Sequence, residues 1–501
     1  MRVATVERPW LLLGFFLLVT LTVYGNTFFN QWTYDDVPVI LQNADVRSLD
    51  AFLQNTVPGR PLRELSFMVD HALFGDSPAG YRLQQLAWHG VNGFLLCLLL
   101  VWLGVELPYA LAGALFFLVH PLQAESVANL AHRKELLALF FSLGSTLLYL
   151  RATAAEGWRQ WLLAGGAVIA YLGAMLSNET AVALSVALVI MEWLVVSREQ
   201  RLLLRRPLGL AVAAATLAAI AVWRYRWVFS PQQLYTVYSK NGFAGASDYL
   251  PLFMASLGSF GFYLGKILLP VRLAPEYVFR LSADMVQPLA WVGAALLAGV
   301  AATVVVLRRR MPLVALGAGW FLAFWLPVSN LVPVAYLVAD RYMYLCLPGV
   351  GIAVAAVLQR WPQRWLMGTC GAVLLALALA TVVQNGHWRN EHTLWRHAVR
   401  VNAGSTWVQG AAAKSYLATG ELESARTHAV EALRLSSFNV EAHLTLARIE
   451  ERLGNFAEAL KQYQLFVALG QVDFPAEVVR VQASIPLLKE RLDVLQRQGR
   501  P

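Results

Sequence analysis

The chain has 501 residues, of which 58% are hydrophobic and 14% charged, and its mean hydropathy is +0.52. A soluble globular domain carries roughly 25% charged residues, so this composition excludes an ordinary soluble protein. The net charge of +9 comes from basic residues in short loops between apolar runs, a pattern typical of membrane proteins and not of nucleic-acid binding. The cysteines, Cys97, Cys346 and Cys370, lie in or beside apolar segments and predict neither a disulfide framework nor a metal site.

Apolar stretches recur along most of the chain, and each is about long enough to cross the ~30 Å hydrocarbon core of a bilayer. They predict an all-α polytopic membrane protein with about 11 spans, the third of them short. The predicted spans are 10–28, 86–105, 108–121, 135–152, 159–176, 179–196, 207–224, 286–307, 312–329, 343–359 and 364–384. Arg2 and Arg8 precede the first span, which is long and is followed by no cleavage site, so we expect a retained signal anchor.

Arginine clusters predict the orientation, because short cytoplasmic loops are enriched in basic residues. The clusters are Arg198/Arg201/Arg205/Arg206, Arg308–Arg310 and Arg360/Arg364. Placing them and the N-terminus in the cytoplasm puts the following segments outside: 29–85, 120–134, 225–248, 330–342 and everything after 385.

Residues 249–270 do not fit this parity, since a crossing there would place Arg308–Arg310 outside. Prolines bracket the segment and glycines interrupt it: Pro251, Pro270, Gly258, Gly261 and Gly265. We therefore expect a re-entrant or interfacial segment of irregular structure, which is tolerated where it lines a cavity in the protein.

The composition changes after about residue 385, which divides the chain into a transmembrane domain (1–384), a connecting helix (385–404) and an extracytoplasmic domain (405–501). The last part contains a self-match of period 34, in which Gly420 aligns with Gly454 and Ala425 with Ala459. This period, with glycine in the first turn and alanine at close helix crossings, is typical of tetratricopeptide repeats. A generic pair of amphipathic helical hairpins is the alternative. Such repeats bind proteins or peptides, so we expect a protein partner outside the cytoplasm.

Two adjacent carboxylates, Asp35 and Asp36, follow the first span directly. Acidic groups at a membrane surface are costly to bury or crowd unless they pair or perform chemistry. A membrane enzyme acting on a lipid-linked substrate needs a carboxylate there. A solvated turn that stops the helix from sliding into the lipid is the alternative.

The predicted orientation gathers further polar groups on the same outer side. They are Arg60, His89, Asn92, His120, Glu125, His132, Arg133, Lys134, Glu135, Asn178, Glu179, Asn330, Asp340 and Arg341. Each piece has a structural explanation, such as a helix cap at Asn178 or a lysine stem that follows the apolar surface. Their convergence on one face is harder to explain that way, because ionisable groups near a membrane are functional candidates.

Long texts in this order resemble the transmembrane and tetratricopeptide-repeat proteins that act as protein O-mannosyltransferases. They are FFNQWTYDDVPVILQNADV, GRPLRELSF, HGVNGFLLCLLL, FFLVHPLQAESVANLAHRKELLALFF, LSNETAV, LPVSNLVPVAYLVADRYMYLCLPGVG and NGHWRNEHTLWRHAVRVN. The resemblance implies a GT-C glycosyltransferase that uses a polyprenyl-phosphate sugar, with a hexose such as mannose, on the lumenal or periplasmic side. The chain departs from animal members in having fewer repeats and Tyr34 where those carry tryptophan. The short repeat region indicates a bacterial relative, with the protein in the inner membrane and the site and repeats in the periplasm.

Transfer from a lipid phosphate needs a base for the acceptor hydroxyl and positive charge for the departing phosphate. We expect Asp35 or Asp36 to be the base, because a carboxylate near hydrocarbon is more basic than usual. The pair also suits Mg²⁺ or Mn²⁺ through oxygen ligands. The predicted donor-binding residues are Arg341, Arg133, Lys134, Arg60, His89 and His120, supported by Glu125, Glu179 and Asp340.

Two other functions are compatible with the sequence. One is a non-catalytic membrane scaffold that assembles envelope proteins through the repeats, and it needs neither Asp35 nor Asp36. The other is a ligase or transporter of lipid-linked saccharides. Transport predicts charges deep within several spans, whereas the polar groups here crowd one side. We therefore expect a glycosyltransferase that acts on a protein or glycan hydroxyl.

Overall fold

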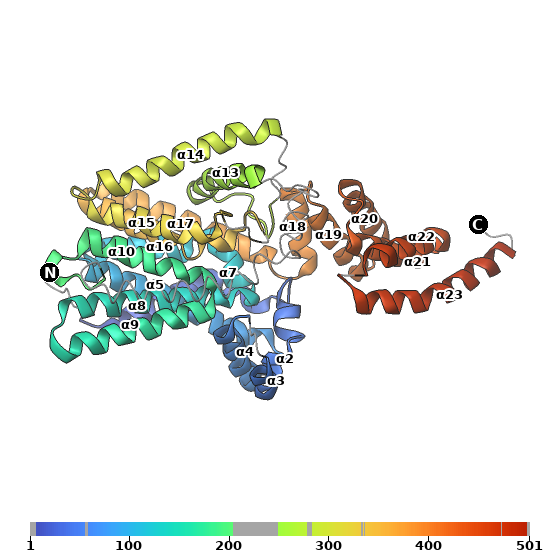
Figure 1. Ribbon diagram of the computed structural model, residues 1–501, viewed down its shortest axis with the longest axis horizontal. Coiled ribbons are helices and arrows are strands. Elements are labelled where there is room, and N and C mark those ends of the chain that lie inside the picture. The colour runs from blue at the N-terminus through green and yellow to red at the C-terminus, as the bar shows by residue number, and fades with distance from the viewer. Residues whose placement is uncertain are drawn as a thin grey trace. The chain divides into compact units, whose positions relative to one another are not determined.

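The computed structural model describes residues 7–55, 59–203, 249–277, 283–331, 334, 336–471 and 473–497. This part of the chain is helical and contains no strand, so the prediction of an all-α protein is confirmed for it. The chain divides into two compact units (Figure 1). The first comprises Met1–Leu273 and Phe279–Arg389, and the second comprises Ala274–Val278 and Asn390–Pro501.

The first unit is a bundle of long apolar helices lying side by side (Figure 1). They are α1 (Pro9–Tyr24), α5 (Pro78–Trp102), α6 (Leu107–Val119), α8 (Arg133–Ala154), α9 (Gly157–Ser177), α10 (Ala183–Val195), α13 (Tyr249–Leu268), α14 (Ala283–Val306), α15 (Pro312–Trp325), α16 (Leu347–Arg360) and α17 (Arg364–His387). Many of their outward side chains are large and apolar, such as Ile169 and Leu375, which are 72% and 62% exposed. Such a surface is stable when it faces lipid and not water.

Six helical segments of the described chain are long and apolar enough to cross a membrane. They are Pro9–Phe29, Pro78–Trp102, Leu130–Ala154, Gly157–Ser177, Pro288–Val306 and Arg364–His387. A seventh candidate is the pair Leu107–Val119 and Pro121–Ala128, which meet at a bend of 48°. Two shorter apolar helices, Pro312–Val328 and Leu347–Arg360, lie at the predicted spans 312–329 and 343–359, and α10 lies within 179–196. The predicted span 207–224 lies outside the described residues, so the count of 11 spans stays a prediction.

Short helices gather at one end of this bundle (Figure 1). They are α2 (Ala44–Arg47), α3 (Leu49–Gln54), α4 (Pro61–Phe74), α7 (Ala124–Ala128) and the single turns η4 (Leu130–His132), η5 (Glu179–Val182) and η8 (Asp340–Met343). At the other end, the Arg308 guanidinium lies 5.4 Å from the centre of the Trp193 ring of α10. The basic turn after α14 is therefore next to the end of α10 that leads to Arg198 and Arg201, and two of the arginine clusters share one end of the unit.

The segment that we expected to be irregular forms one continuous helix, α13. It packs against α14, where a Cβ on Gly293 would come within 1.8 Å of the Leu257 carbonyl oxygen. Gly258 and Gly261 of α13 face the same helix, with Leu289 and Gly293 of α14 among their nearest neighbours. The glycines that suggested irregularity therefore lie where two helices approach closely, a common use of small residues in membrane helices.

The second unit consists of α18 (Glu391–Val401), α19 (Thr406–Thr419), α20 (Leu422–Leu435), α21 (Val440–Leu453), α22 (Phe456–Leu469) and α23 (Pro475–Arg497), together with the segment before α14. In sequence order, each of these helices packs against the next. Gly420 and Gly454 do not lie in the first turn of a helix, because they cap the C-termini of α19 and α21. Both have a φ of +83°, a conformation that glycine adopts without strain.

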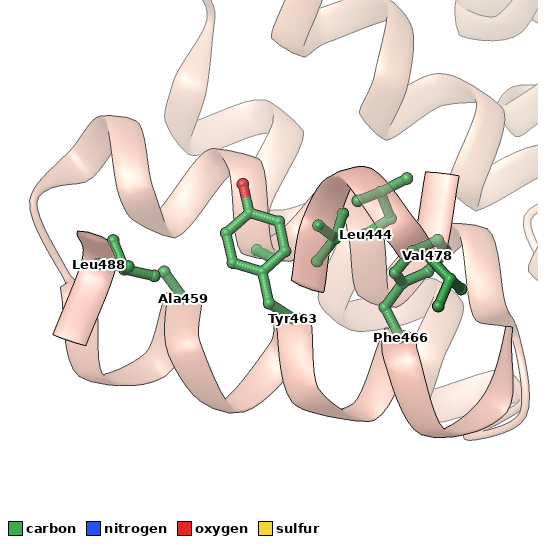
Figure 2. Packing of buried hydrophobic residues seen from close by; sticks show 8 residues of the cluster. Leu444, Ala459, Tyr463, Phe466, Val478 and Leu488 are labelled. Atoms are coloured by element: carbon green, nitrogen blue, oxygen red, sulfur yellow. The ribbon is translucent and has the colours of Figure 1, made fainter. Parts of the chain in front are cut away.

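Buried apolar side chains of α21, α22 and α23 pack together in the second unit (Figure 2). Leu444 of α21, Ala459 and Phe466 of α22, and Val478 and Leu488 of α23 belong to one buried cluster. The buried alanine allows two helices to approach closely, and the aromatic ring fills the wider gap beside it. The final helix thus covers an apolar face of α22 that would otherwise be exposed.

Replacing Gly454 by alanine should destabilise the second unit by about 1–2 kcal/mol, because an L-residue is strained at a positive φ. Hydrogen exchange of the intact protein in detergent would show this as faster exchange of the amides in α21 and α22. Gly410→Ala is the matched control: Gly410 lies inside α19, its Cβ would meet nothing closer than 3.6 Å, and alanine there should leave protection equal or higher. Equal protection in the parent and the Gly454 variant would contradict the account of the cap.

Candidate functional site

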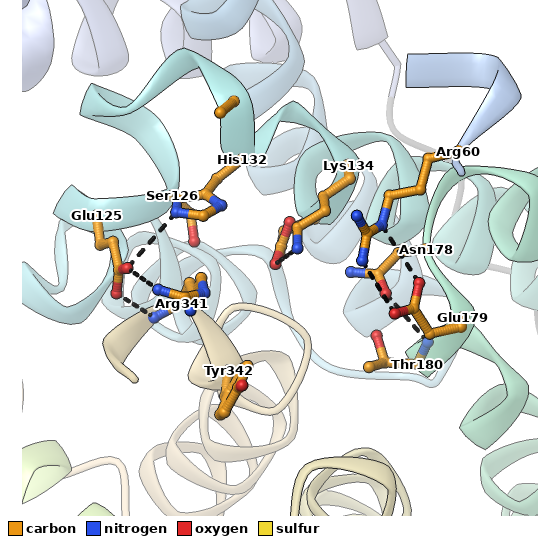
Figure 3. Close-up of polar contacts among 12 residues, drawn as sticks. Arg60, Glu125, Ser126, His132, Lys134, Asn178, Glu179, Thr180, Arg341 and Tyr342 are labelled. Carbon is orange, nitrogen blue, oxygen red and sulfur yellow. Dashed lines mark hydrogen bonds and ion pairs between the residues drawn. The ribbon is translucent and has the colours of Figure 1, made fainter. Parts of the chain in front are cut away.

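A group of charged side chains meets at the end of the bundle that carries α4 and α7 (Figure 3). Nη1 of Arg341 lies 2.5 Å from Oε1 of Glu125, and the backbone N–H of Arg341 donates to Oε2 of the same carboxylate at 2.8 Å. Glu125 therefore fixes both the backbone and the side chain of Arg341. Burial opposes the charge of this arginine, but Glu125 and neighbouring tyrosines outweigh it and raise the pKa of Arg341 above its usual value.

The Arg341 guanidinium also lies against two tyrosine rings, 4.8 Å from the centre of Tyr336 and 5.4 Å from that of Tyr342. The Tyr336 hydroxyl is 3.2 Å from the Tyr34 hydroxyl, next to Asp35 in the chain. Among the described residues, no hydrogen bond uses Nε or Nη2 of Arg341. These N–H groups can therefore bind an anion while the rest of the side chain is held in place.

A second ion pair lies on the other side of the cluster (Figure 3). Arg60, directly before α4, donates from Nη2 to Oε1 of Glu179 at 3.0 Å and from Nε to Oε2 at 3.3 Å. Asn178 caps the turn that carries Glu179 by accepting from the backbone N–H of Thr180 at 3.1 Å. Lys134 is drawn between the two pairs in Figure 3, and its Nζ is 3.5 Å from Oε1 of Glu135.

The two adjacent carboxylates have different surroundings. Asp36 is fully buried and accepts from the backbone N–H of Thr33 at 3.2 Å and from that of Ala131 at 2.9 Å. Asp35 is partly exposed, and within the described residues its carboxylate makes no hydrogen bond or ion pair. Tyr34 has a φ of +54°, a strained conformation for a residue with a side chain. Of the two predicted bases, the structure leaves only Asp35 available to a substrate.

Side chains of α5 hold the Asp35 loop against the stretch that contains Glu125 and Lys134. The buried guanidinium of Arg82 donates to the carbonyls of Gln31 at 2.8 Å and Ala128 at 2.6 Å. Gln85 donates to the carbonyl of Ser126 at 2.8 Å. Because carbonyls of irregular segments need partners when buried, Arg82 fixes both segments at once and Gln85 fixes the second of them.

Several predicted donor-binding residues have structural roles instead. Arg133 is fully buried, and its donors are used by Gln85, Gln84 and the Tyr81 carbonyl, with Asp70 at 2.5 Å. It lies in the first turn of α8, directly before Lys134, but it ties α4 and α5 to α8 and does not enter the cluster.

The two predicted histidines are also bonded within the protein. The nitrogens of His89 meet the Tyr344 hydroxyl at 2.8 Å and the Leu118 carbonyl at 2.9 Å. Those of His120 meet the Ile267 carbonyl at 3.0 Å and the backbone N–H of Leu122 at 3.2 Å. Asp340 is buried next to Arg341, and its charge acts on Lys266.

Sequence reasoning gave no role to two residues of the cluster. His132 lies beside Glu125, with Nε2 3.5 Å from Oε1, and Tyr336 covers the Arg341 guanidinium. Tyr336 carried no usable signal, since aromatic residues are common throughout the chain. His132 could have been selected from its position between Glu125 and Lys134 in the sequence.

The carboxylates do not suit a metal held by the pair. Asp36 is fully buried and each of its oxygens accepts a backbone N–H group, so the fold already uses this carboxylate. In the described part of the chain, no group of three or more histidine, cysteine, aspartate or glutamate side chains is arranged to hold an ion. We therefore derive no chemical step that uses a metal.

The burial of Asp36 predicts a pH dependence of stability. Burial raises the pKa of Asp36 to about 7, although the Arg82 guanidinium and the two backbone amides oppose the rise. The folded protein thus binds this proton more tightly than the unfolded chain, so stability is lost as the pH rises from about 4 towards 7. Asp36→Asn removes this titration.

Thermal unfolding in detergent at pH 5 and pH 8 tests the point. The difference in Tm between the parent and Asp36→Asn should narrow at pH 8, because only the parent loses the stabilisation that comes from protonated Asp36. Asp50→Asn, which removes an exposed carboxylate in the first turn of α3, should follow the parent at both values. A difference that stays constant or widens would contradict the raised pKa of Asp36.

Comparison with known proteins adds an independent observation. The chain is 24% identical to "Protein O-mannosyl-transferase Tmtc3" of Drosophila melanogaster, over 86% of this chain and 56% of that protein. It is 23% identical to "Protein O-mannosyl-transferase TMTC3" of Mus musculus, over 90% of this chain and 54% of that protein. The chain therefore spans about half the length of these curated relatives. No family model and no solved structure matches it. The names of these relatives are those of the family that the motifs around Asp35 and Arg341 resemble.

Proposed function

We propose that this protein is a membrane glycosyltransferase of the GT-C type. It would transfer a sugar, a hexose such as mannose, from a polyprenyl-phosphate carrier to a hydroxyl of an extracytoplasmic protein or glycan. One observation carries the proposal: the available carboxylate of Asp35 lies in a loop fixed against a cluster of buried cations at the end of an apolar bundle. The names of the relatives support the same activity.

In the proposed reaction, Asp35 acts as general base. Its carboxylate takes the proton of the acceptor hydroxyl, whose oxygen forms a bond to the anomeric carbon. The bond between that carbon and the phosphate oxygen breaks, and its electron pair remains on the departing phosphate. A positioned carboxylate typically contributes about 10²–10⁴-fold to such a step.

The departing phosphate gains negative charge, which the cations of the cluster would stabilise. Arg341 is placed first, because Glu125 and two tyrosines hold its guanidinium while Nε and Nη2 stay available. Lys134 and Arg60 supply further positive charge nearby. Glu125 and Glu179 position the arginines and reduce the net positive charge of the cluster. A less positive cluster binds free anions less strongly, so the departing phosphate need not displace one.

The proposal assigns the second unit to acceptor binding. Its helix pairs repeat with a period of 34 residues, and the first helix of each pair ends in a glycine cap of the same conformation, which supports a tetratricopeptide-repeat fold. The end of the bundle that carries the cluster would face the outside, which is the periplasm in a bacterial host. The two arginine clusters that share the opposite end support a cytoplasmic position for that end.

Removing the carboxylate of Asp35 tests the proposed base. Asp35→Asn should lower the initial rate of sugar transfer at least about 100-fold, because the amide cannot accept the proton. The assay uses purified membranes, a radiolabelled polyprenyl-phosphate hexose and the native envelope fraction as acceptor, at matched amounts of inserted protein. Asp50→Asn removes an exposed carboxylate in the first turn of α3 and should keep the parental rate. Transfer that survives in Asp35→Asn would reject this base, and no transfer by the parent with any donor would favour a scaffold.

Changing Arg341 to lysine tests the phosphate contact. Lysine keeps one positive charge but lacks the planar set of N–H donors with which arginine can bind Glu125 and the phosphate at the same time. We expect kcat to fall about 10- to 100-fold with little change in Tm, since Glu125 keeps a cationic partner. Arg201→Lys, at the opposite end of the bundle, is the control and should transfer at the parental rate. An Arg341→Lys variant with parental kcat would remove Arg341 from the mechanism.

A further inference from the structure

His132 is a buried histidine whose ring is not used by the fold. It is 3% exposed, and among the described residues neither Nδ1 nor Nε2 has a hydrogen-bond partner. Oε1 of Glu125, the nearest charged oxygen to Nε2, is 3.5 Å away and already contacts Arg341. Buried polar atoms without partners are rare and costly, so each needs a reason.

The two other buried histidines at this end of the bundle show what a structural histidine looks like. Both nitrogens of His89 are bonded, to Tyr344 and Leu118, and both nitrogens of His120 are bonded, to Ile267 and Leu122. Three of these bonds join separate helices or turns, and the fourth, from Leu122, caps the turn that follows His120. His132 makes no such bond, so the packing of the bundle does not explain why a histidine stands at this position.

Other donors near His132 are also unused. The Ser126 hydroxyl and the Asn129 amide nitrogen are buried without hydrogen-bond partners, and both belong to the same stretch as His132. In Figure 3, Ser126 and His132 lie on the side of the cluster where Glu125 meets Arg341. A hydroxyl, an amide and an imidazole can each donate a hydrogen bond. One stretch of chain therefore holds three buried donor groups without an acceptor.

The charges around His132 indicate the nature of that acceptor. Its cationic neighbours are Arg341 and Lys134, and Glu135 and Asp35 act on it as acidic ones. A ligand that meets two cations and unused donors is an anion rich in acceptor oxygens. Phosphate has this chemistry, and it can come from a lipid headgroup or from free phosphate.

We propose that His132 binds the phosphate of the sugar donor directly, as a further residue of the transfer site, with its N–H donating to a phosphate oxygen. This inference rests on the proposed transfer from a lipid-linked phosphate. The bound phosphate satisfies the ring nitrogen that the fold leaves unpaired. Arg341 and Lys134 supply the charge, and His132 supplies a directed donor that fixes the orientation of the phosphate.

Replacing His132 by leucine separates a ligand-binding role from a structural one. Leucine is similar in size and removes both unpaired nitrogens, so without ligand the Tm should equal or exceed that of the parent. Stabilisation by a short-chain polyprenyl monophosphate should then be lost, with an apparent affinity about 10- to 100-fold weaker. His89→Leu is the comparator, and it should lower the Tm because it removes two buried hydrogen bonds, to the Tyr344 hydroxyl and to the Leu118 carbonyl.

The measurement is the Tm of the purified full-length protein in detergent across a titration of polyprenyl monophosphate, with inorganic phosphate as a second arm. A response to both probes shows that the phosphate group is sufficient, and a response to the lipid alone shows that the prenyl chain is needed. Either result supports the proposal if the rise in Tm on adding the probe is smaller in His132→Leu than in the parent. His132→Asn, which keeps an N–H close to the position of Nδ1, should retain part of the response.

Two results would overturn the inference. One is a lower Tm of His132→Leu without ligand, with a parental response to polyprenyl monophosphate, which would make the histidine structural. The other is a parent that transfers sugar but whose Tm does not respond to either probe. In both cases a parent that still transfers sugar leaves the proposed function standing, whereas a parent without transfer rejects that function separately.

Discussion

The arrangement of the cluster depends on one buried carboxylate. Asp36 accepts the backbone N–H of Thr33 in its own loop and that of Ala131 in the turn before α8. Arg82 strengthens this connection by binding carbonyls of both segments from α5. Because the two segments are nearly 100 residues apart in the chain, few other contacts could hold them in register. Asp36 therefore fixes the loop that carries Asp35 against the stretch that carries Glu125 and Lys134, which explains why two adjacent carboxylates are present although only one is available.

The rest of the cluster follows from the cost of burying charge. An unpaired buried ion is strongly unfavourable, so Arg341 and Arg60 each have a glutamate from a different turn. These pairs position the cations before a substrate arrives, and such preorganisation is what an electrostatic mechanism needs. The remaining polar atoms are not all satisfied, however. The unused donors of Ser126, Asn129 and His132 lie in the same stretch as Glu125 and Lys134, and they point to an anion as the missing partner.

The sequence predicts the class of fold and the end of the molecule at which the polar groups meet. The length and hydropathy of the apolar runs determine the helices, and the arginine clusters assign the polar turns to one side, where Glu125, Lys134, Glu179 and Arg341 do come together. The division of roles between Asp35 and Asp36 could not be predicted, because it depends on the amide of Ala131, which is distant in the chain. The same reason applies to Arg133, whose partner Asp70 lies on another helix. In α13, the glycines predict breaks but lie against α14, because a sequence does not show which helix face meets a neighbour.

The central claim is that a donor phosphate binds between Arg341, Lys134 and the loop of Asp35. The most direct test is an experimental structure of the full-length protein with a non-hydrolysable polyprenyl-phosphonate hexose. The account predicts phosphonate oxygens within hydrogen-bond distance of Arg341, and the anomeric carbon facing the Asp35 carboxylate. A donor headgroup bound elsewhere, with Arg341 still occupied only by Glu125 and the two tyrosines, would contradict it.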